Sequence, residues 1–145
     1  MPISLLEAPR GITRFAKAQL FHDVCAALDD AYRLGDVRVY LREYADEDVG
    51  QAGYDVGQDW GDEAEPPRIL MTIEGPPLSE VTVKRTMVEK IYAALAKGYD
   101  GLTDLGKIAI FINEYPIENA AFGGRLQVDN PDDAEALMSL ERGKT

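Results

Sequence analysis

The fold is decided by a stretch that occurs twice, as VRVYLREYADEDVGQAG at 37–53 and as IAIFINEYPIENAAFGG at 108–124. Upstream of it, CAALDDAY at 25–32 matches YAALAKGY at 92–99. The offset between the two copies changes only in the segment between helix and strand, where loops accept insertions. The chain is therefore predicted to contain two fused copies of one structural unit.

Each unit is predicted to be a strand, a helix and a second strand. The predicted strands are short apolar or β-branched runs: PISLLEA at 2–8, VRVYL at 37–41, RILMTIE at 68–74 and KIAIFI at 107–112. A strand–helix–strand connection makes the two strands parallel, with a right-handed crossover. Two such units give an α/β fold, α+β by some schemes, in which a four-stranded sheet carries both helices on one face.

The other face of this sheet needs a different cover. A strand such as IAIFI at 108–112 is apolar on both of its faces, whereas the two helices cover only one. Oligomerisation is the expected way to bury the uncovered face.

Helical periodicity defines the two long helices. The first is expected over 14–33, with Thr13 as its N-cap and Gly35 near its end. Its apolar face is predicted to comprise Ala18, Phe21, Cys25, Leu28 and Tyr32. A second helix is expected after Ser79, with Val81, Met87, Val88, Ile91 and Leu95 on one face. A short C-terminal helix is expected from Asn130-Pro131.

The 145 residues are predicted to form a single domain at 1–145. It divides into unit one (2–53), a linker (54–67), unit two (68–127) and a C-terminal tail (128–145). The linker is acidic and rich in Gly and Pro. Trp60 within it is read either as a packing anchor or as a ligand-stacking residue.

Composition excludes several classes of partner. A net charge of −11 argues against nucleic acid and anionic membranes, but a local arginine pair can still bind a small anion. No run is long enough to span a membrane, and with one cysteine a cytoplasmic location is expected. His22 is the single histidine, so no metal site or histidine-based triad is predicted.

Pro2 is the sharpest candidate for chemistry. Removal of Met1 would leave a secondary amine at the start of the first strand, and an amine in an apolar site can be neutral near pH 7 and accept a proton. The alternative is that Pro2 is simply a tolerated strand start. The repeat places Ile69 at the equivalent position of unit two, and an internal amide cannot act as a base.

A Pro2 strand, duplicated units and a late Gly-Gly hairpin together resemble the tautomerase superfamily over residues 2–127. The matching residues include VRV at 37–39, Glu43 and Gly53, which are similar to the 4-oxalocrotonate tautomerase subunit. DAYR at 30–33, Glu114, Pro116 and Gly124-Arg125 resemble fused members such as the cis-3-chloroacrylic acid dehalogenase group. The resemblance implies a homotrimer and catalysis by an amino-terminal proline.

The resemblance also implies two arginines that bind substrate. Arg38 matches the strand arginine of VRV, which polarises the substrate's oxygen, and Arg10 follows the first strand where the family often places a carboxylate-binding arginine. The alternatives are an outward-facing strand residue for Arg38 and a surface residue for Arg10.

Three aromatic residues depart from the dehalogenase pattern. Tyr32, Phe111 and Phe122 stand where that group has a histidine, a tyrosine and the water-activating glutamate, and no arginine lies between Arg68 and Lys84. These aromatic residues could line an apolar substrate pocket, or simply pack in the core or trimer interface.

The predicted function is that of a tautomerase-like enzyme. Pro2 would act as general base in the keto–enol interconversion of a small 2-oxo acid, a carboxylate substrate, without a cofactor. The alternatives are a cofactor-free hydratase or dehalogenase of unsaturated acids, and a non-catalytic trimeric binding protein on the same scaffold.

Overall fold

The fold was examined in a computed structural model, which describes residues 1–49, 68–78, 80–102 and 108–142. Its elements in chain order are β1 (Ile3–Pro9), α1 (Arg14–Tyr32), β2 (Arg38–Tyr44), η1 (Asp46–Asp48), β3 (Ile69–Gly75), α3 (Val81–Gly98), β4 (Ile108–Glu114), η2 (Ile117–Asn119), β5 (Ala121–Phe122), β6 (Arg125–Leu126), η3 (Gln127–Asp129) and α4 (Pro131–Arg142). The predicted linker, with Trp60, lies outside the described residues, as do Gly53 and Ser79.

The four main strands form one sheet in the order β2-β1-β3-β4. Within each unit the strands are parallel, as predicted, and the two units meet through the antiparallel pair β1–β3. In this central pair Ile3 lies opposite Glu74, and Glu7 lies opposite Leu70. The start of β1 therefore lies beside the ends of β3 and β4, at the edge of the sheet that we call the Pro2 end.

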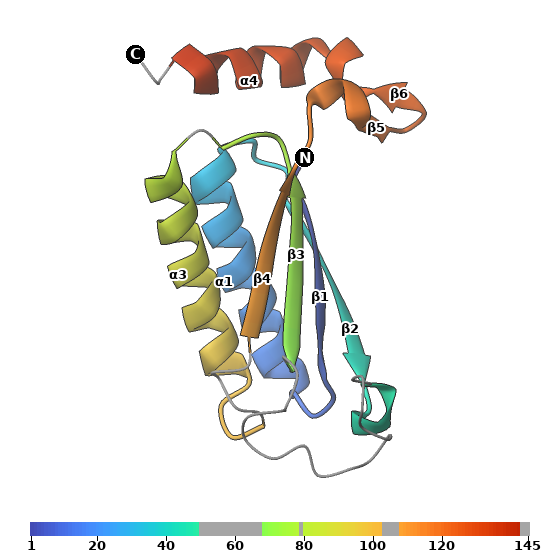
Figure 1. The fold of residues 1–145 in the computed structure, drawn as a ribbon, viewed down its shortest axis with the longest axis vertical. Coiled ribbons are helices and arrows are strands. Elements are labelled where there is room, and N and C mark those ends of the chain that lie inside the picture. The colour runs from blue at the N-terminus through green and yellow to red at the C-terminus, as the bar shows by residue number, and fades with distance from the viewer. Residues whose placement is uncertain (50–67, 79, 103–107, 143–145) are drawn as a thin grey trace, which may run out of the picture.

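Both long helices cover the same face of the sheet, which confirms the predicted architecture (Figure 1). The core between the layers is built from alternate strand residues, such as Leu6, Met71 and Ile73, and from α1 and α3. Thr13 caps α1 as predicted, because its hydroxyl accepts a hydrogen bond from the Ala16 amide at 3.1 Å.

The predicted apolar face of α1 is only partly correct. Leu28 and Tyr32 are buried, but Ala18 is exposed, and Phe21 and Cys25 are only half-buried. The buried residues of α1 are Leu20, Val24, Ala27, Leu28, Ala31 and Tyr32. The helix ends within one residue of the predicted boundary, at a left-handed Arg33 with φ 54°, whose amide donates to the Asp29 carbonyl.

The duplication extends to side-chain interactions. Lys17 pairs with Glu43 at 2.9 Å in the first unit, and Lys84 pairs with Glu114 in the second. Two buried tyrosines, Tyr32 and Tyr99, follow the same repeat at the ends of α1 and α3. The two units thus reproduce each other as an approximate two-fold repeat about the β1–β3 pair.

Tyr32 reaches the sheet because residue 75 has no side chain. A Cβ at Gly75 would lie 2.7 Å from the Cε1, Cζ and hydroxyl oxygen of Tyr32, which is closer than atoms can pack. The aromatic ring of α1 therefore lies directly on the backbone of β3 at the Pro2 end.

None of the helices in the described residues covers the opposite face of the sheet (Figure 1). Its middle row runs across all four strands as Tyr40, Leu5, Thr72 and Phe111. Tyr40 and Phe111 are 54% and 57% exposed, and Leu5 is 37% exposed. This open face is the apolar surface that the strand composition predicts.

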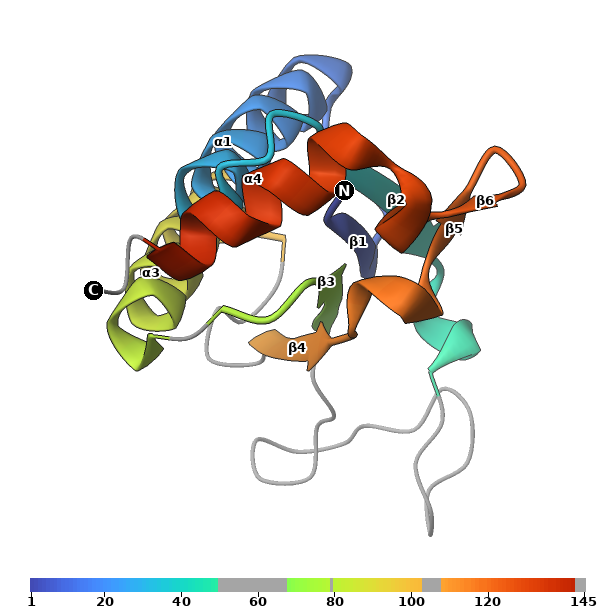
Figure 2. The same ribbon diagram turned by 90° about the horizontal axis from the view of Figure 1, so that it is seen from above.

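The C-terminal region lies apart from the two-layer core. The hairpin β5–β6 follows the fourth strand, and α4 crosses the end of the molecule where the N-terminus lies (Figures 1 and 2). Pro131 is its first residue, as predicted. Among the described residues, no helix combines the length and apolar character that a bilayer crossing requires.

The contact between Tyr32 and Gly75 generates a stability prediction. Gly75→Ala is expected to lower the free energy of unfolding by about 1–3 kcal/mol, because the new methyl group must displace a buried ring. Urea denaturation measures this loss, and Tyr32→Leu in the same chain should recover part of it.

Gly98→Ala is the matched control. The added Cβ would lie 3.4 Å from Ile12 at the last turn of α3, which is an ordinary contact. This variant should be neutral or stabilised by up to about 1 kcal/mol. Equal losses for the two variants would contradict the packing explanation.

Candidate functional site

Pro2 is buried at the start of β1, on the side of the sheet that faces the helices. Its carbonyl oxygen accepts a hydrogen bond from the Arg38 amide at 3.0 Å, which ties the first residues to β2. Met1 is half-buried, and its own carbonyl accepts a hydrogen bond from the Tyr115 hydroxyl at 3.1 Å. Hydrogen bonds from β2 and from the residue after β4 thus hold the start of the chain.

Arg38 lies next to Pro2, on β2. It is the parallel partner of Ile3, and its side chain is 56% exposed. The guanidinium Nε donates to an Asp36 carboxylate oxygen at 3.3 Å, so its charge is partly balanced within the same loop. The remaining donors of the guanidinium can bind a carboxylate or a developing oxyanion.

Glu114 ends β4 on the helix side of the same end. Its carboxylate pairs with the Lys84 ammonium and accepts a hydrogen bond from the Leu78 amide at 3.2 Å. The Lys84 hydrogen bond is the largest cause that lowers the pKa of Glu114 from its ordinary 4.5. This ion pair fixes the first turn of α3 to the end of the sheet.

Tyr32 packs over Gly75 at the same end of the sheet. Its ring is fully buried, and its hydroxyl forms no hydrogen bond within the described residues. Burial raises its pKa well above 10.0, with smaller contributions from Glu114, Tyr115 and Glu74. The hydroxyl therefore remains protonated near neutral pH and can act only as a neutral group.

The environment at the Pro2 end changes the basicity of an amine. Burial is the main cause that lowers the pKa of the Met1 amine from 8.0, while Asp133 and Asp36 act in the opposite direction. Desolvation disfavours an ammonium ion at this edge of the sheet, and the two carboxylates partly offset that effect.

The six predicted site residues are only partly brought together in one protomer. Pro2, Arg38 and Tyr32 lie at the Pro2 end. Arg10 lies past the other end of β1, eight residues from Pro2, or about 26 Å at ~3.3 Å per residue. Within one chain, Arg10 therefore cannot share a substrate with Pro2.

The two phenylalanines lie in different parts of the structure. Phe111 is in the middle row of the open face, across from Thr72, three positions along the sheet from the Pro2 end. Phe122 is half-buried in the short hairpin strand β5. Within one protomer, Phe111 therefore lies two strands away from β1 and three positions from the Pro2 end.

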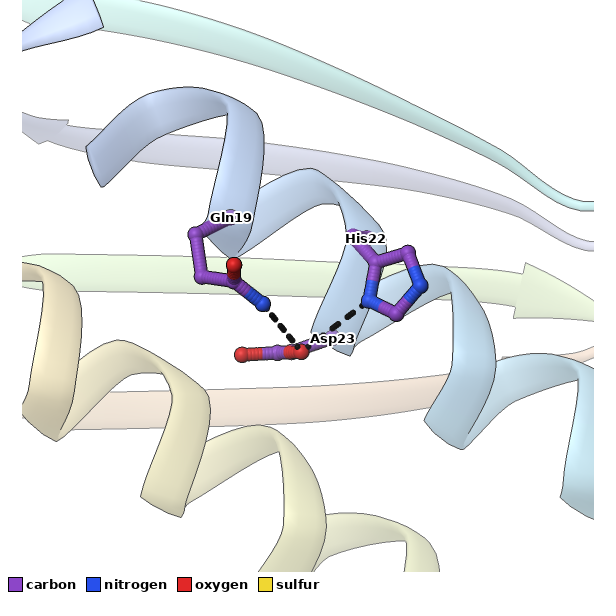
Figure 3. Close-up of polar contacts among 3 residues, drawn as sticks. All are labelled: Gln19, His22 and Asp23. Atoms are coloured by element: carbon purple, nitrogen blue, oxygen red, sulfur yellow. Dashed lines mark hydrogen bonds and ion pairs between the residues drawn. The ribbon is translucent and has the colours of Figure 1, made fainter. Parts of the chain in front are cut away.

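The single histidine is on the outer surface of α1, as predicted. Its Nδ1 lies 3.2 Å from Asp23, whose carboxylate also accepts a hydrogen bond from Gln19 at 2.9 Å (Figure 3). The side chain of His22 is 77% exposed. Cys25 is half-buried, and burial raises the pKa of its thiol.

The described residues hold no cluster of metal ligands, and the hollow between the two long helices is not lined by the predicted site residues. Among the described residues, no three His, Cys, Asp or Glu side chains are grouped so that they could hold a metal ion. A hollow of about 660 Å³ lies between the end of α1 and the start of α3, bordered by Asp29, Arg33, Glu80 and Lys90. None of the six predicted residues lines it.

Solved structures with this arrangement were compared with the chain as a whole. A fused 4-OT, described as a symmetric trimer, is 21% identical and superposes with a TM-score of 0.67 over 86% of this chain and 94% of its own. The chain has the tautomerase fold. Malonate semialdehyde decarboxylase is 17% identical, with a TM-score of 0.62 over 94% of this chain and 97% of its own.

A third solved structure is Pt0534 inactivated by 2-oxo-3-pentynoate, which is 14% identical with a TM-score of 0.66 over 86% of this chain and 94% of its own. No protein-family model matches the sequence, and no curated protein matches it either. The resemblance inferred from the motifs is confirmed as a fused, two-unit tautomerase fold.

The sequence-based prediction missed Tyr115, Glu114 and Lys84 as members of this end of the sheet. Glu114 and Tyr115 were visible in the repeat, where Glu43-Tyr44 of unit one falls on them. Lys84 corresponds to Lys17 at the offset of the helices. The recurrence of these three residue types in both units was the available signal. It did not indicate which face of the sheet or helix each side chain would occupy.

The Lys84–Glu114 pair predicts a pH-dependent loss of stability. The folded-state pKa of Glu114 is lowered, so its stabilising contribution is present above about pH 4.5 and is lost as the pH falls through the folded-state value. Glu114→Gln should cost up to about 1 kcal/mol at neutral pH, because solvent screens a partly exposed pair. Urea denaturation midpoints of the wild type and of Glu114→Gln, at neutral and at acidic pH, measure this loss of stability.

The exposed Glu118→Gln serves as the control and should change little at either pH. The cost of Glu114→Gln should shrink as the pH falls through the lowered folded-state pKa of Glu114, where the wild-type carboxylate also becomes protonated. A cost that stays the same at both pH values would show that the ion pair is not its source.

Proposed function

We propose that this protein is a tautomerase-like enzyme, in which the Pro2 amine moves a proton in the keto–enol interconversion of a small 2-oxo acid. The observation that carries the proposal is a buried Pro2 at the start of the central strand β1, at an end of the sheet where burial lowers the pKa of the neighbouring Met1 amine. The fold shared with fused 4-OT and malonate semialdehyde decarboxylase supports it.

The proposed reaction begins once Met1 has been removed. The neutral ring nitrogen of Pro2 accepts a proton from C3 of the 2-oxo acid, and the electron pair of that C–H bond forms the C2–C3 double bond. The carbonyl electrons then reside on the C2 oxygen as an enolate. Transfer of a proton from the protonated Pro2 amine to that oxygen gives the enol and restores the neutral amine, and the reverse sequence gives the ketone.

Arg38 is the proposed partner for the negative charge. On β2 it pairs with Ile3, the residue after Pro2. Its guanidinium can contact the substrate's oxygen as negative charge develops there. The buried ring of Tyr32, packed on Gly75, excludes water from one side of the site. Neither step requires a bound cofactor or an activated water molecule.

A homotrimer is part of the proposal. The open face of the sheet carries the exposed Tyr40, Leu5 and Phe111, and solved fused 4-OT structures are described as trimers. In such an assembly Arg10, Phe111 or Phe122 of one subunit could approach Pro2 of another. This would explain how residues that are separated in one protomer could share a substrate.

Two alternatives remain distinct from tautomerisation. Hydration or dehalogenation of an unsaturated acid would need a group that activates water, and Phe122 occupies the position where the dehalogenase resemblance places that glutamate. A non-catalytic trimeric binding protein would keep the scaffold and retain Met1. The mass of the mature protein separates this last alternative from both enzymes.

The first test uses the mature protein from its native host. Mass spectrometry should show loss of Met1, and 2-oxo-3-pentynoate should form an adduct on the peptide that begins with Pro2. Pro2→Ala should lower kcat/KM for phenylenolpyruvate or 2-hydroxymuconate by about 10²-fold or more, since it changes the proton-transferring group. Retention of Met1, or unchanged activity of Pro2→Ala, would overturn the proposal.

Two arginine variants provide the comparison for the binding role. Arg38→Ala should raise KM or lower kcat by about tenfold or more, because a charged hydrogen bond to the substrate is lost. Arg85, exposed on the outer surface of α3, is the control, and Arg85→Ala should leave both constants unchanged. Equal effects of the two substitutions would remove Arg38 from the site.

The trimer generates a separate prediction. Leu5→Glu places a charge in the centre of the open face and should lower the molar mass measured by light scattering from that of a trimer toward that of a monomer. Phe15→Glu is the matched control, because Phe15 is 82% exposed but lies on the opposite layer, in α1. A trimer that survives Leu5→Glu would contradict burial of this face.

A further inference from the structure

The Tyr115 hydroxyl is aimed at the first peptide bond of the chain. It donates to the Met1 carbonyl oxygen at 3.1 Å, and the carbon of that carbonyl is bonded directly to the Pro2 nitrogen. The phenol therefore lies within one hydrogen bond and two covalent bonds of the proposed catalytic nitrogen. Removal of Met1 takes away the oxygen to which Tyr115 donates.

The same interaction recurs at the start of the second unit, where the acceptor belongs to an internal peptide bond that removal of Met1 does not affect. Tyr44 corresponds to Tyr115, and its hydroxyl donates to the carbonyl of Arg68, the residue before Ile69. Ile69 in turn corresponds to Pro2. At this end the acceptor is an internal peptide bond and stays in place, so Tyr44 keeps a purely structural partner.

We propose that Tyr115 is a further catalytic residue, which donates a hydrogen bond to the C2 oxygen of the bound 2-oxo acid. This inference rests on the proposed function, because it assumes that Pro2 is the amino-terminal base. The space vacated by the Met1 carbonyl is the place where an oxygen of the substrate can accept the same hydrogen bond.

The placement of Tyr115 supports a role in transition-state stabilisation. Its backbone amide donates to the Gly75 carbonyl at 3.0 Å, so the residue is held at the end of β4 beside β3. Arg38 approaches Pro2 from β2 on the other side. A substrate between them would have one neutral and one charged donor near its C2 oxygen.

The protonation state of Tyr115 suits this role. Burial, assisted by Asp133 and Glu74, raises the pKa of its hydroxyl above the ordinary 10.0, so the phenol keeps its proton at neutral pH. During the reaction the C3 proton passes to Pro2 and the negative charge develops on the C2 oxygen. Tyr115 loses no proton in this step, but its hydrogen bond strengthens as that charge grows.

The test compares Tyr115→Phe with Tyr44→Phe in the full chain from which Met1 has been removed, in the assembly that it forms in solution. Tyr115→Phe should lower kcat for phenylenolpyruvate ketonisation by about 10²-fold, with KM within about threefold, because the donor acts mainly in the transition state. Tyr44→Phe removes the equivalent hydroxyl at the unprocessed end and should leave kcat unchanged. Equal kcat values for the two variants would overturn the assignment.

The separate effects of Tyr115→Phe on KM and on kcat also show which substrate atom the Tyr115 hydroxyl contacts. A rise in KM alone would place its hydroxyl on the substrate carboxylate and would overturn the C2-oxygen assignment. Pro2→Ala, measured in parallel, separates this inference from the proposed function. Loss of activity in Pro2→Ala with full activity in Tyr115→Phe would overturn the role of Tyr115 alone.

A spectroscopic measurement makes the placement testable whatever the substrate. With 13C-labelled tyrosine, the Cζ signal of Tyr115 is assigned by its disappearance in Tyr115→Phe. In the processed protein this signal should follow the titration of the Pro2 amine, and the Tyr44 signal should not. A Tyr115 signal that does not respond to the amine would show that the two groups are not neighbours.

Discussion

The antiparallel pairing of β1 with β3 is the constraint on which the rest of the structure depends. Each unit alone is a parallel pair with one helix, and such a pair cannot bury both faces of its strands. Joining the units through their first strands places both helices on one side and brings the start of β1 against the end of β3. The Pro2 end of the sheet is a direct result of this register.

The same pairing explains why residues from both units meet at each end of the sheet. Tyr32, at the end of α1, lies on Gly75 of the second unit, and Tyr115 of the second unit reaches Met1 of the first. The contact between a tyrosine hydroxyl and a backbone carbonyl recurs at the other end, where Tyr44 donates to Arg68. The two ends differ in the residue that follows the acceptor, which is Pro2 at one end and Ile69 at the other.

Much of the fold could be predicted because strand periodicity and the repeat are strong local signals. The buried face of α1 was harder, since α1 contains Ala16, Ala18, Ala26, Ala27 and Ala31 on different sides, and small residues do not define a face. The end of the helix was predicted to within one residue, but the left-handed conformation of Arg33 was not, because a residue in that conformation is usually glycine or asparagine. Pro2 and Arg38 were predictable as neighbours from the strand order that the resemblance implies.

The remaining site residues depend on geometry that sequence spacing does not contain. Phe111 and Glu114 are three residues apart on β4, and this odd spacing places them on opposite faces of the sheet. The separation of Arg10 from Pro2 follows from the length of β1, which a motif alone does not specify. The role inferred for Tyr115 required knowing which carbonyl its hydroxyl contacts.

The hydrogen bond between Tyr115 and Met1 also has a consequence for biosynthesis. Tyr115 is made 114 residues after Met1, which at ~5–20 residues per second is a delay of roughly 6–23 s on the ribosome. In the folded chain Met1 is half-buried and its carbonyl accepts the hydrogen bond from Tyr115. The proposed removal of Met1 would therefore be easiest before the fourth strand and α4 have formed.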